Sequence, residues 1–345
     1  MRAPFEIGGQ KVPAGQRVTI DLPIGSFSNH MPATMPVRIL HGRKPGPVIF
    51  VSAAVHGDEV IGVEIIRRLL RASAIRRLKG TLICIPVVNA FGFINRQRYL
   101  PDRRDLNRSF PGGPNGSLAG QLAHLFATEI ISRCDFGIDL HSAAEHRVNM
   151  PQIRLTPGNQ ELYEAAMTFG APIILESPVR DGSLRKAALE LGVGVLLYEA
   201  GEALRFDEFS VRVGLKGILN VLKLKGMIGG KTIITPKNPP IHTSSSRWIR
   251  SPLGGMFRAL HTTGDLVHKG DTLGYVSDPF GDDDQEVLSL SDGIIIGRTN
   301  LPFVNPGDAL FHIAHVHSTR TATKNMEGIE MEIEADPLFD EDEII

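Results

Sequence analysis

The stretch PVIFVSAAVHGDE, residues 47–59, joins two patterns that decide the fold. Its first nine residues form an apolar run rich in β-branched side chains, which is typical of a strand buried on both faces. A helical pattern follows over residues 59–72. Between the two stand His56, Asp58 and Glu59, one imidazole and two carboxylates. Acidic residues also favour the first turn of any helix, so this stretch alone fits either a helix start or half of a metal site.

Strand-like and helix-like patterns alternate beyond this stretch. Further apolar runs are GTLICIPVV, CDFGIDL, APIILES and VGVLLYEA. Helical patterns lie between or after them, at residues 117–134, 159–170, 183–192 and 207–224. This alternation predicts an α/β sheet that is covered by helices on both sides.

Changes in composition divide the chain into five segments. Residues 1–42 contain short strands with Gly, Pro and Ser turns and are predicted to pack on the α/β domain of residues 43–225. Residues 226–247 are rich in Gly, Pro and Ser and are predicted to form a connection. Residues 248–316 carry short strands with Gly-Asp turns, which predict a small all-β domain. Residues 317–345 are predicted to be an acidic tail.

The bulk composition excludes several classes of protein. The chain of 345 residues is 42% hydrophobic, and its 37 basic and 38 acidic side chains leave a net charge of -1, unlike an electrostatic nucleic-acid binder. Cys84 and Cys134 lie in apolar surroundings, which argues against a disulfide framework. The N-terminus lacks the apolar core of a signal peptide, and no apolar stretch reaches membrane-spanning length. We therefore expect a cytoplasmic protein without nucleic-acid or membrane partners, and homo-oligomer formation stays open.

Polar side chains follow four of the predicted strands. His56, Asn89, His141 and Glu199 each stand at or just beyond the end of an apolar run. Ligands of open α/β sheets bind beyond the carboxyl ends of the strands. We therefore expect these four side chains to converge on one edge of the sheet.

Two of these side chains, His56 and His141, are suited to form a metal site together with Glu59. His56 and Glu59, three residues apart, can face one point as the chain turns into a helix, and His141 arrives from a neighbouring strand. Two histidines and one carboxylate leave a zinc coordination position open for water, as catalytic sites require. Asp139, two residues before His141, could support that ring. Asp58 is predicted to cap the helix.

The segment RQRYLPDRRDLNRSFPGG, residues 96–113, points to the substrate. Asn107 and Arg108 stand between Leu106 and the segment SFP, which predicts a partly buried guanidinium group. An arginine fork binds a carboxylate through two parallel hydrogen bonds. The sequence therefore predicts a substrate that carries a carboxylate.

Four motifs together resemble a known family. HGDE, DLNRSFPG, DLHS and LYEAGE, in this order, are similar to the succinylglutamate desuccinylase/aspartoacylase family, a branch of the zinc carboxypeptidase superfamily. The resemblance covers roughly residues 45–225. It implies a mixed sheet flanked by helices, with a smaller C-terminal all-β domain that looks lipoyl- or biotinyl-like. The LSDGIII hairpin carries no lysine, so we predict no lipoylated or biotinylated site.

The resemblance assigns roles to the strand-end residues. It implies one zinc ion per chain on His56, Glu59 and His141. Glu199 matches the general base of the family. Glu202, a second carboxylate nearby, is predicted to be a supporting group.

The resemblance also assigns roles to the arginine-rich segment. Asn107 and Arg108 would hold a substrate carboxylate. Arg98 matches the arginine that polarises the carbonyl group of the bond to be cleaved. Arg103 and Arg104 stay open as alternatives, because the segment from Arg98 onward looks longer than in some family members.

These assignments predict a zinc-dependent amidohydrolase. Zinc lowers the pKa of a bound water from about 15.7 toward about 7, and Glu199 would move the proton to the leaving amine. The leading hypothesis is hydrolysis of a small N-acyl amino acid or N-acyl amine. The alternative is a metallocarboxypeptidase that trims C-terminal residues, including acidic ones, from peptides. A non-catalytic binding protein of this fold predicts loss of a ligand or of the base, yet all four residues are present.

Overall fold

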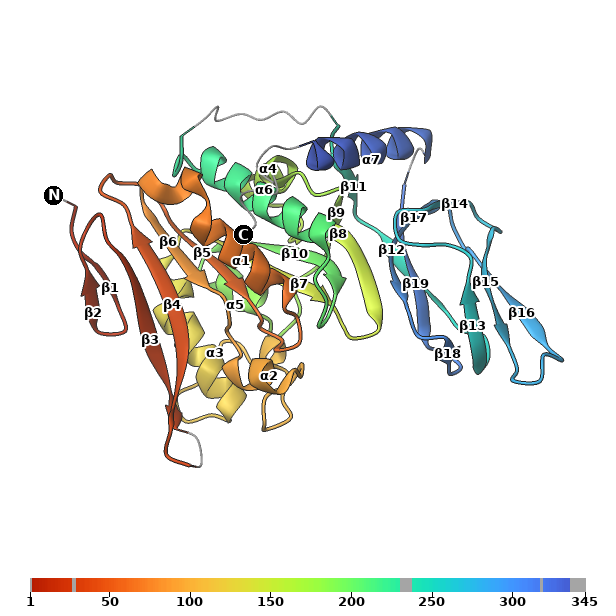
Figure 1. The fold of residues 1–345 in the computed structure, drawn as a ribbon, viewed down its shortest axis with the longest axis horizontal. Helices are drawn as coiled ribbons and strands as arrows, with labels where there is room; N and C mark the ends of the chain where they lie inside the picture. The colour runs from red at the N-terminus through yellow and green to blue at the C-terminus, as the bar shows by residue number, and fades with distance from the viewer. Residues whose placement is uncertain (1, 27–28, 230–237, 317–318, 336–345) are drawn as a thin grey trace.

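The computed structural model describes residues 2–26, 29–229, 238–316 and 319–335. Within these residues the chain is built around one large mixed sheet with helices on both faces (Figure 1). Parallel strands form its centre, in the spatial order β10 (Gly194–Glu202), β7 (Phe136–Ala143), β5 (Val48–Ala53) and β6 (Thr81–Ile85). This architecture confirms the predicted α/β fold with a mixed sheet.

Other strands extend this centre at both edges. Beyond β6 lie the antiparallel strands β4 (Pro32–His41) and β3 (Arg17–Ser26). Beyond β10 lies the antiparallel strand β8 (Arg147–Leu155), which leads to the parallel strands β9 (Ile173–Glu176) and β11 (Ile241–Thr243). The short strands β1 (Phe5–Ile7) and β2 (Gln10–Val12) pair only with each other in the described part of the chain.

The helices cover the two faces of the sheet separately. One face carries α1 (Ile61–Arg71), α4 (Gln160–Phe169) and α6 (Glu208–Leu224). The other carries α3 (Leu118–Glu129) and α5 (Leu184–Glu190). Short helices complete the connections: α2 (Ala90–Asn95), η1 (Ser73–Arg77), η2 (Leu106–Arg108) and η3 (Ile131–Arg133).

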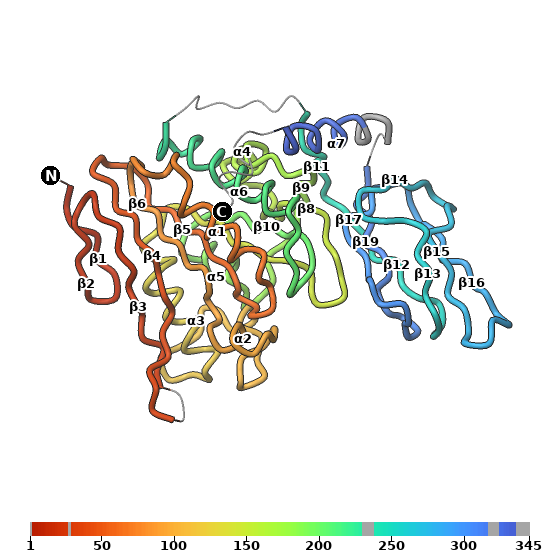
Figure 2. The backbone as a smooth tube through the Cα atoms, in the orientation of Figure 1, coloured from red at the N-terminus to blue at the C-terminus, as the bar shows by residue number. Residues whose placement is uncertain are grey.

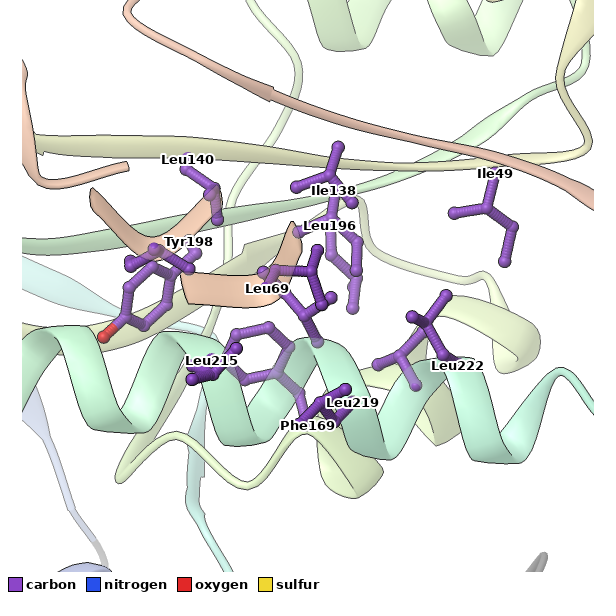
Figure 3. Packing of buried hydrophobic residues seen from close by; sticks show 14 of the residues in the cluster. Ile49, Leu69, Ile138, Leu140, Phe169, Leu196, Tyr198, Leu215, Leu219 and Leu222 are labelled. Carbon is purple, nitrogen blue, oxygen red and sulfur yellow. The ribbon is translucent and has the colours of Figure 1, made fainter. Parts of the chain in front are cut away.

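The central strands are buried on both faces, as their apolar runs predict. Successive residues of β5 point to opposite sides, so Ile49 and Val51 join the core beneath α1 and α6, whereas Phe50 joins the core beneath α3. Figure 3 shows the first of these cores, where Ile138 of the sheet faces Leu219 of α6. A sheet covered in this way exposes its functional groups only at the strand ends.

The C-terminal strands continue the same large sheet. Strand β17 (Gly293–Thr299) pairs with β8, and β19 (Ala309–His315), β12 (Ser246–Arg250) and β14 (Leu266–Val267) follow through it. A second sheet holds β18 (Phe303–Val304), β13 (Gly255–Ala259), β15 (Thr272–Ser277) and β16 (Asp284–Leu288). The predicted all-β region is therefore present, but main-chain hydrogen bonds join it to the α/β region (Figure 2).

The segment predicted to be an acidic tail begins with a helix. Helix α7 (Thr319–Glu334) packs against α6. Its side chains Met326, Ile329 and Ile333 are buried, at the three- and four-residue spacing of one helix face. The prediction is wrong for this part of residues 317–345, because three apolar side chains at helical spacing can dock the helix. The remainder of the predicted tail, residues 336–345, lies outside the described residues.

None of the described helices combines the length and the apolar character that crossing a membrane requires.

Candidate active site

A tight turn places His56 and Glu59 beyond the end of β5. Ala54 has a φ of 51°, in the left-handed region that a residue with a side chain adopts rarely. Gly57 lies against the start of α2, where an added Cβ would stand 2.0 Å from the carbonyl carbon of Gly92. The sequence His-Gly-Asp-Glu is therefore held by close backbone packing, which only glycine at the second position allows.

The helix after this turn begins later than predicted. Helix α1 begins at Ile61, and its N-cap residue Val60 makes no side-chain capping bond. The prediction that Asp58 caps the helix is therefore wrong. The Asp58 side chain is buried, and its Oδ1 atom has no hydrogen-bond partner among the described residues. Burial raises the pKa of this carboxyl group, and the charge of Glu59 raises it further.

Three buried side chains form a compact cluster of metal-binding atoms. His56, Glu59 and His141 are each at most 4% exposed, and one ligand atom from each lies within 4.8 Å of the others. The two oxygens of Glu59 divide between the rings, with Oε1 at 2.6 Å from His56 Nδ1 and Oε2 at 2.7 Å from His141 Nδ1. The structure thus brings together the three residues that were predicted to meet, His56 and Glu59 from one turn and His141 from a neighbouring strand.

Further carboxylates hold the outer nitrogens of both rings. His56 Nε2 lies 3.1 Å from Asp105 Oδ1, and His141 Nε2 lies 2.8 Å from Asp139 Oδ2. Asp139 in turn accepts a 2.7 Å hydrogen bond from Ser52 Oγ, because the two residues stand side by side in β7 and β5. Histidines that bind metals usually carry such a carboxylate on the nitrogen away from the ion. The donor set therefore fits a divalent metal such as zinc.

The charges of this cluster depend on one another. Burial alone would raise the pKa of Glu59, but the two histidines and their hydrogen bonds hold it well below its usual range. Burial alone would lower the pKa of His141, but Asp139 and Glu59 hold it well above its usual value. Opposite charges packed this closely account for both shifts.

Glu199 lies beside this cluster on the adjacent strand. It pairs with His141 in the parallel register of β10 and β7. Asn149 Nδ2 donates a 2.8 Å hydrogen bond to its Oε2, and Arg154 NH1 lies 3.6 Å from its Oε1. An added Cβ at Gly297 of β17 would stand 2.7 Å from the Asn149 side-chain oxygen. The C-terminal region therefore leaves the space in which Asn149 holds Glu199.

Of the three arginines considered for the carbonyl group, only Arg98 reaches this site in the described structure. Its guanidinium group lies 3.3 Å from Glu59 Oε1 and 3.0 Å from Asp105 Oδ2. Arg103 and Arg104 are both exposed and do not line the cavity beside the metal-binding atoms. The geometry therefore favours Arg98 over the two alternatives.

Arg108 lacks the partial burial that was predicted for it, and its neighbour Asn107 is the buried residue of the two. Asn107 is 9% exposed, and its Oδ1 accepts a 2.9 Å hydrogen bond from Leu184 N at the start of α5. Arg108 is exposed rather than partly buried, although both residues line the cavity. The amide nitrogen of Asn107 takes no part in that bond and can donate to a ligand. The guanidinium group of Arg108 donates to the main-chain oxygen of Asn107.

One cavity of about 280 Å³ contains all of these groups. Its walls carry His56, Glu59 and His141, together with Glu199, Arg98, Asn107 and Arg108. Further arginines line it as well, at positions Arg147, Arg154, Arg180 and Arg185. A concave site with convergent polar groups of this kind is the expected form of a small-molecule active site.

Comparison with known proteins agrees with this arrangement. The family model of the succinylglutamate desuccinylase/aspartoacylase catalytic domain matches residues 45–225. The chain belongs to this family. N-alpha-acetyl-L-2,4-diaminobutyric acid deacetylase from Halomonas elongata is 28% identical over 334 residues, covering 89% of this chain and 97% of that protein.

Two solved structures share the fold along most of the chain. The succinylglutamate desuccinylase/aspartoacylase from Rhodobacter sphaeroides is 27% identical, with a TM-score of 0.78 over 88% of this chain and 96% of that one. The product-bound ectoine utilization protein EutE (DoeB) from Ruegeria pomeroyi is 24% identical, with a TM-score of 0.78 over 87% and 95%. The C-terminal strands are therefore part of the shared fold.

Two residues near the family motifs lie apart from the cavity. Asn89 caps α2, since its Oδ1 accepts a hydrogen bond from Gly92 N. Glu202 accepts hydrogen bonds from His146 N and Asn300 Nδ2, which links it to the chain just after β17. Neither side chain lines the cavity, so both belong to the framework around the site.

Several cavity residues lie outside the motifs of the desuccinylase/aspartoacylase family that the sequence displays. Asn149 and Arg154 stand on β8, a strand that the apolar pattern does not predict because polar residues interrupt it. Trp248, from β12, closes the cavity from the C-terminal region and stacks on His312 at 4.5 Å between ring centroids.

Arg185 stands out among the arginines of the cavity. Its NH2 donates to Ser177 Oγ, but its NH1 is buried and has no partner in the described structure. Burial, and after it the nearby charge of Arg154, lower the pKa of Arg185 to about 10. A buried guanidinium nitrogen without a partner is costly, so this part of the cavity favours an anionic ligand group.

Proposed function

We propose that the chain is a zinc-dependent deacylase that hydrolyses the amide bond of a small N-acyl amino acid or N-acyl amine. One observation carries most of the proposal: the His56–Glu59–His141 cluster shares a cavity with Glu199 and several arginines. The family supports the same class of reaction, because its members are named as a desuccinylase, an aspartoacylase and a deacetylase.

In this proposal His56, Glu59 and His141 hold the zinc ion. A bound zinc ion supplies Lewis acidity, which makes water a competent nucleophile near neutral pH and polarises a carbonyl oxygen. Glu199, oriented by the hydrogen bond from Asn149, accepts the proton of the attacking water and passes it to the leaving amine. Arg98 stabilises the negative charge that develops on the carbonyl oxygen.

We assign the substrate carboxylate to Asn107 and Arg108. The Asn107 side chain is already fixed by Leu184 N, so its amide nitrogen is positioned to donate without further ordering. Arg108 adds a charged fork that can close over the same carboxylate. This arrangement orients the amide bond toward the metal-binding side chains.

We further propose that the substrate carries a second anionic group, which binds near Arg154 and Arg185. The unpartnered NH1 of Arg185 supports this assignment, because an anion would supply the missing acceptor. The deacetylase of Halomonas elongata is named for a substrate with a free amino group. A cationic amino group beside Arg185 would be repelled, so we expect this chain to prefer a diacid substrate.

The first experiment assays the purified zinc-loaded protein with a panel of N-acyl amino acids beside a panel of peptides. We expect amine release from small N-acyl amino acids with acidic groups. Amine release from peptides alone would instead support the carboxypeptidase alternative and overturn the deacylase proposal. Adding a chelator should abolish the activity, and zinc should restore it.

The second experiment tests the base with Glu199→Gln, using Glu202→Gln as the matched control. We expect Glu199→Gln to retain zinc and to lose on the order of 10³-fold in kcat. Glu202→Gln changes a carboxylate on the same strand that does not line the cavity, so its activity should stay within about threefold of wild type. Unchanged hydrolysis by Glu199→Gln would refute the role of Glu199.

The third experiment tests the second anionic group with Arg185→Met. We expect the preference for a diacid over a monoacid N-acyl substrate to fall by roughly 30-fold, mainly through KM. Arg133→Met is the matched control, because Arg133 also has a buried nitrogen without a partner but lies outside the cavity. A preference that survives Arg185→Met would place the second group elsewhere.

A further inference from the structure

A second cavity, of about 500 Å³, opens at the opposite end of the central strands. We call it the amino-edge cavity. It is lined by three chain segments: the turn of residues 15–17, the end of β4 with residues 42–44, and residues 75–79 before β6. The second and third of these segments lead into the amino ends of β5 and β6, and the first leads into β3. The length of β5 alone, six residues, separates it from the catalytic cavity by on the order of 20 Å.

The walls of this cavity carry charges of one sign. Six cationic side chains line it, and no acidic residue does: Arg17, Arg43, Lys44, Arg76, Arg77 and Lys79. In the described parts of the chain no carboxylate pairs with any of them, and the one side-chain hydrogen bond among them runs from Arg17 to Ile75 O. The whole chain has a net charge of -1, so this local excess is not a general property of its surface.

The floor of the cavity is different in character. Leu40, Ile75 and Leu78 line it and are at most 7% exposed. His41 also lines it, and its two ring nitrogens are already held by Thr81 Oγ1 and Ala3 O at 2.9 and 3.0 Å. The cavity thus combines an apolar, fixed floor with a rim of exposed cations.

This combination selects a class of ligand. Arginine forks and lysines bind phosphate oxygens, and a terminal phosphate group carries close to two negative charges at neutral pH, whereas a phosphate inside a polyphosphate chain carries about one. Two or three phosphate groups would therefore neutralise most of the rim, whereas a single carboxylate would leave most of it unpaired. The volume lies within the usual range of small-molecule sites, and the buried floor can receive a ring or a short apolar group.

We propose that the amino-edge cavity binds a small anion with two or more phosphate groups, separately from the catalytic cavity. The chemistry is that of a nucleoside polyphosphate or of a polyphosphorylated lipid headgroup. Each source presents clustered phosphate oxygens to Arg76 and Arg77, which stand next to each other in η1. Their side chains are exposed and have no carboxylate partner among the described residues, so binding needs no ion pair to break.

The test measures binding of three probes to the full chain by calorimetry and vesicle sedimentation. The probes are inorganic triphosphate, ATP, and phosphatidylcholine vesicles that contain phosphatidylinositol bisphosphate. We expect saturable one-site binding that weakens as salt is raised from 50 to 300 mM, because the rim charges are exposed. Binding of the soluble probes supports a nucleotide-like source, and binding of the vesicles alone supports a lipid source.

Charge reversal locates the site. Arg76→Glu with Arg77→Glu should weaken binding at least tenfold, and Arg43→Gln with Lys44→Gln should weaken it by a smaller factor. Arg247→Glu with Lys269→Glu is the matched control, since it reverses the same number of exposed charges in the C-terminal region and should leave binding within twofold. Hydrolytic activity and circular dichroism of each variant confirm that it is folded.

A rival location is the arginine-rich catalytic cavity. Binding that is lost in Arg154→Ala with Arg185→Ala, but kept in the Arg76/Arg77 variant, would overturn the proposal. Absence of saturable binding for all three probes would overturn it as well. Binding that survives the catalytic-cavity substitutions and is lost with Arg76 and Arg77 supports it.

Discussion

Both ends of the central sheet carry several arginines, but the two ends differ in whether carboxylates lie beside them. At the carboxyl end, Arg98 pairs with Glu59 and Asp105, and Arg154 lies near Glu199. At the amino end, six cations line the amino-edge cavity without one carboxylate among the described residues. Burial explains the difference for Arg98 and Arg154, because charges removed from water favour nearby carboxylates, whereas water screens exposed charges. The charges of Arg98 and Arg154 are therefore part of a fixed network, whereas Arg185 and the cations of the amino end remain available to a ligand.

The largest effect is expected where one carboxylate serves both histidines. Glu59→Gln should lower kcat/KM by about 10³-fold or more and strip most of the bound metal, because Glu59 contacts both rings. Hydrolysis assays and elemental analysis measure the two effects. Glu64→Gln, on α1, is the control and should keep both metal and activity. Full metal content in Glu59→Gln would contradict the assignment of the cluster.

A smaller effect is expected at Asp139, which contacts His141. Asp139→Asn should weaken zinc affinity by roughly 10- to 100-fold, because Asp139 holds His141 Nε2 at 2.8 Å. Competition with a chelator of known affinity measures the change. Ser52→Ala removes only the hydrogen bond to the other oxygen of Asp139 and should have a clearly smaller effect. Equal losses in both variants would mean that Asp139 acts through packing alone.

A selective effect is expected at the wall of the catalytic cavity. Trp248→Ala should raise kcat/KM for bulky acyl groups relative to acetyl by roughly tenfold, because the indole ring closes one side of the cavity. Trp248→Phe should keep most of the wild-type preference. Trp248 is also the single tryptophan of the chain, so its fluorescence should change when a substrate analogue binds the wild-type protein. An unchanged acyl preference in Trp248→Ala would show that the wall does not select the substrate.

The smallest effect is expected at the amino-edge cavity, where substitution should raise the thermal stability of the protein. Arg76→Gln with Arg77→Gln should raise Tm by at most about 1 °C at low salt, because like charges are removed from an exposed rim. The gain should vanish at 0.5 M salt, where exposed charges are screened. Arg98→Gln should instead lower the Tm of the metal-free protein by roughly 2 to 4 °C, because it leaves Glu59 and Asp105 without their cation. Melting curves at two salt concentrations compare the ends directly.

The α/β region could be predicted well because its signals are local. The apolar runs and helical patterns mark strands and helices within a few residues. The strand-end rule predicts that four side chains meet, and His56, His141 and Glu199 line one cavity, whereas Asn89 caps α2 instead. Helix α7 escaped prediction because its acidic composition outweighs three apolar positions, Met326, Ile329 and Ile333. Composition describes the solvent-facing side of such a helix, whereas docking depends on the narrow side that faces the core.

The walls of the catalytic cavity could not be predicted, because they depend on contacts between distant segments. Asn149 and Arg154 reach the cavity through the pairing of β8 with β10, whose register shifts between Glu199 and Gly201. Such an irregularity changes which side chains share a face of the sheet, and no pattern of residues in the sequence predicts it. The burial of Arg108 was mispredicted for a related reason, since flanking apolar residues report on their own side chains and not on that of their neighbour.

The pairing of β17 with β8 has a consequence for how the molecule comes apart. A boundary near residue 247 separates the α/β segment of the sequence from the C-terminal strands. The pairing of β8 with β17 crosses this boundary and includes Asn149, which donates a hydrogen bond to Glu199. Removing the C-terminal strands would leave main-chain groups of β8 without hydrogen-bond partners, and other molecules could then pair with this edge. The C-terminal strands are thus an integral part of the fold. We expect the α/β region and the C-terminal strands to unfold in one cooperative thermal transition.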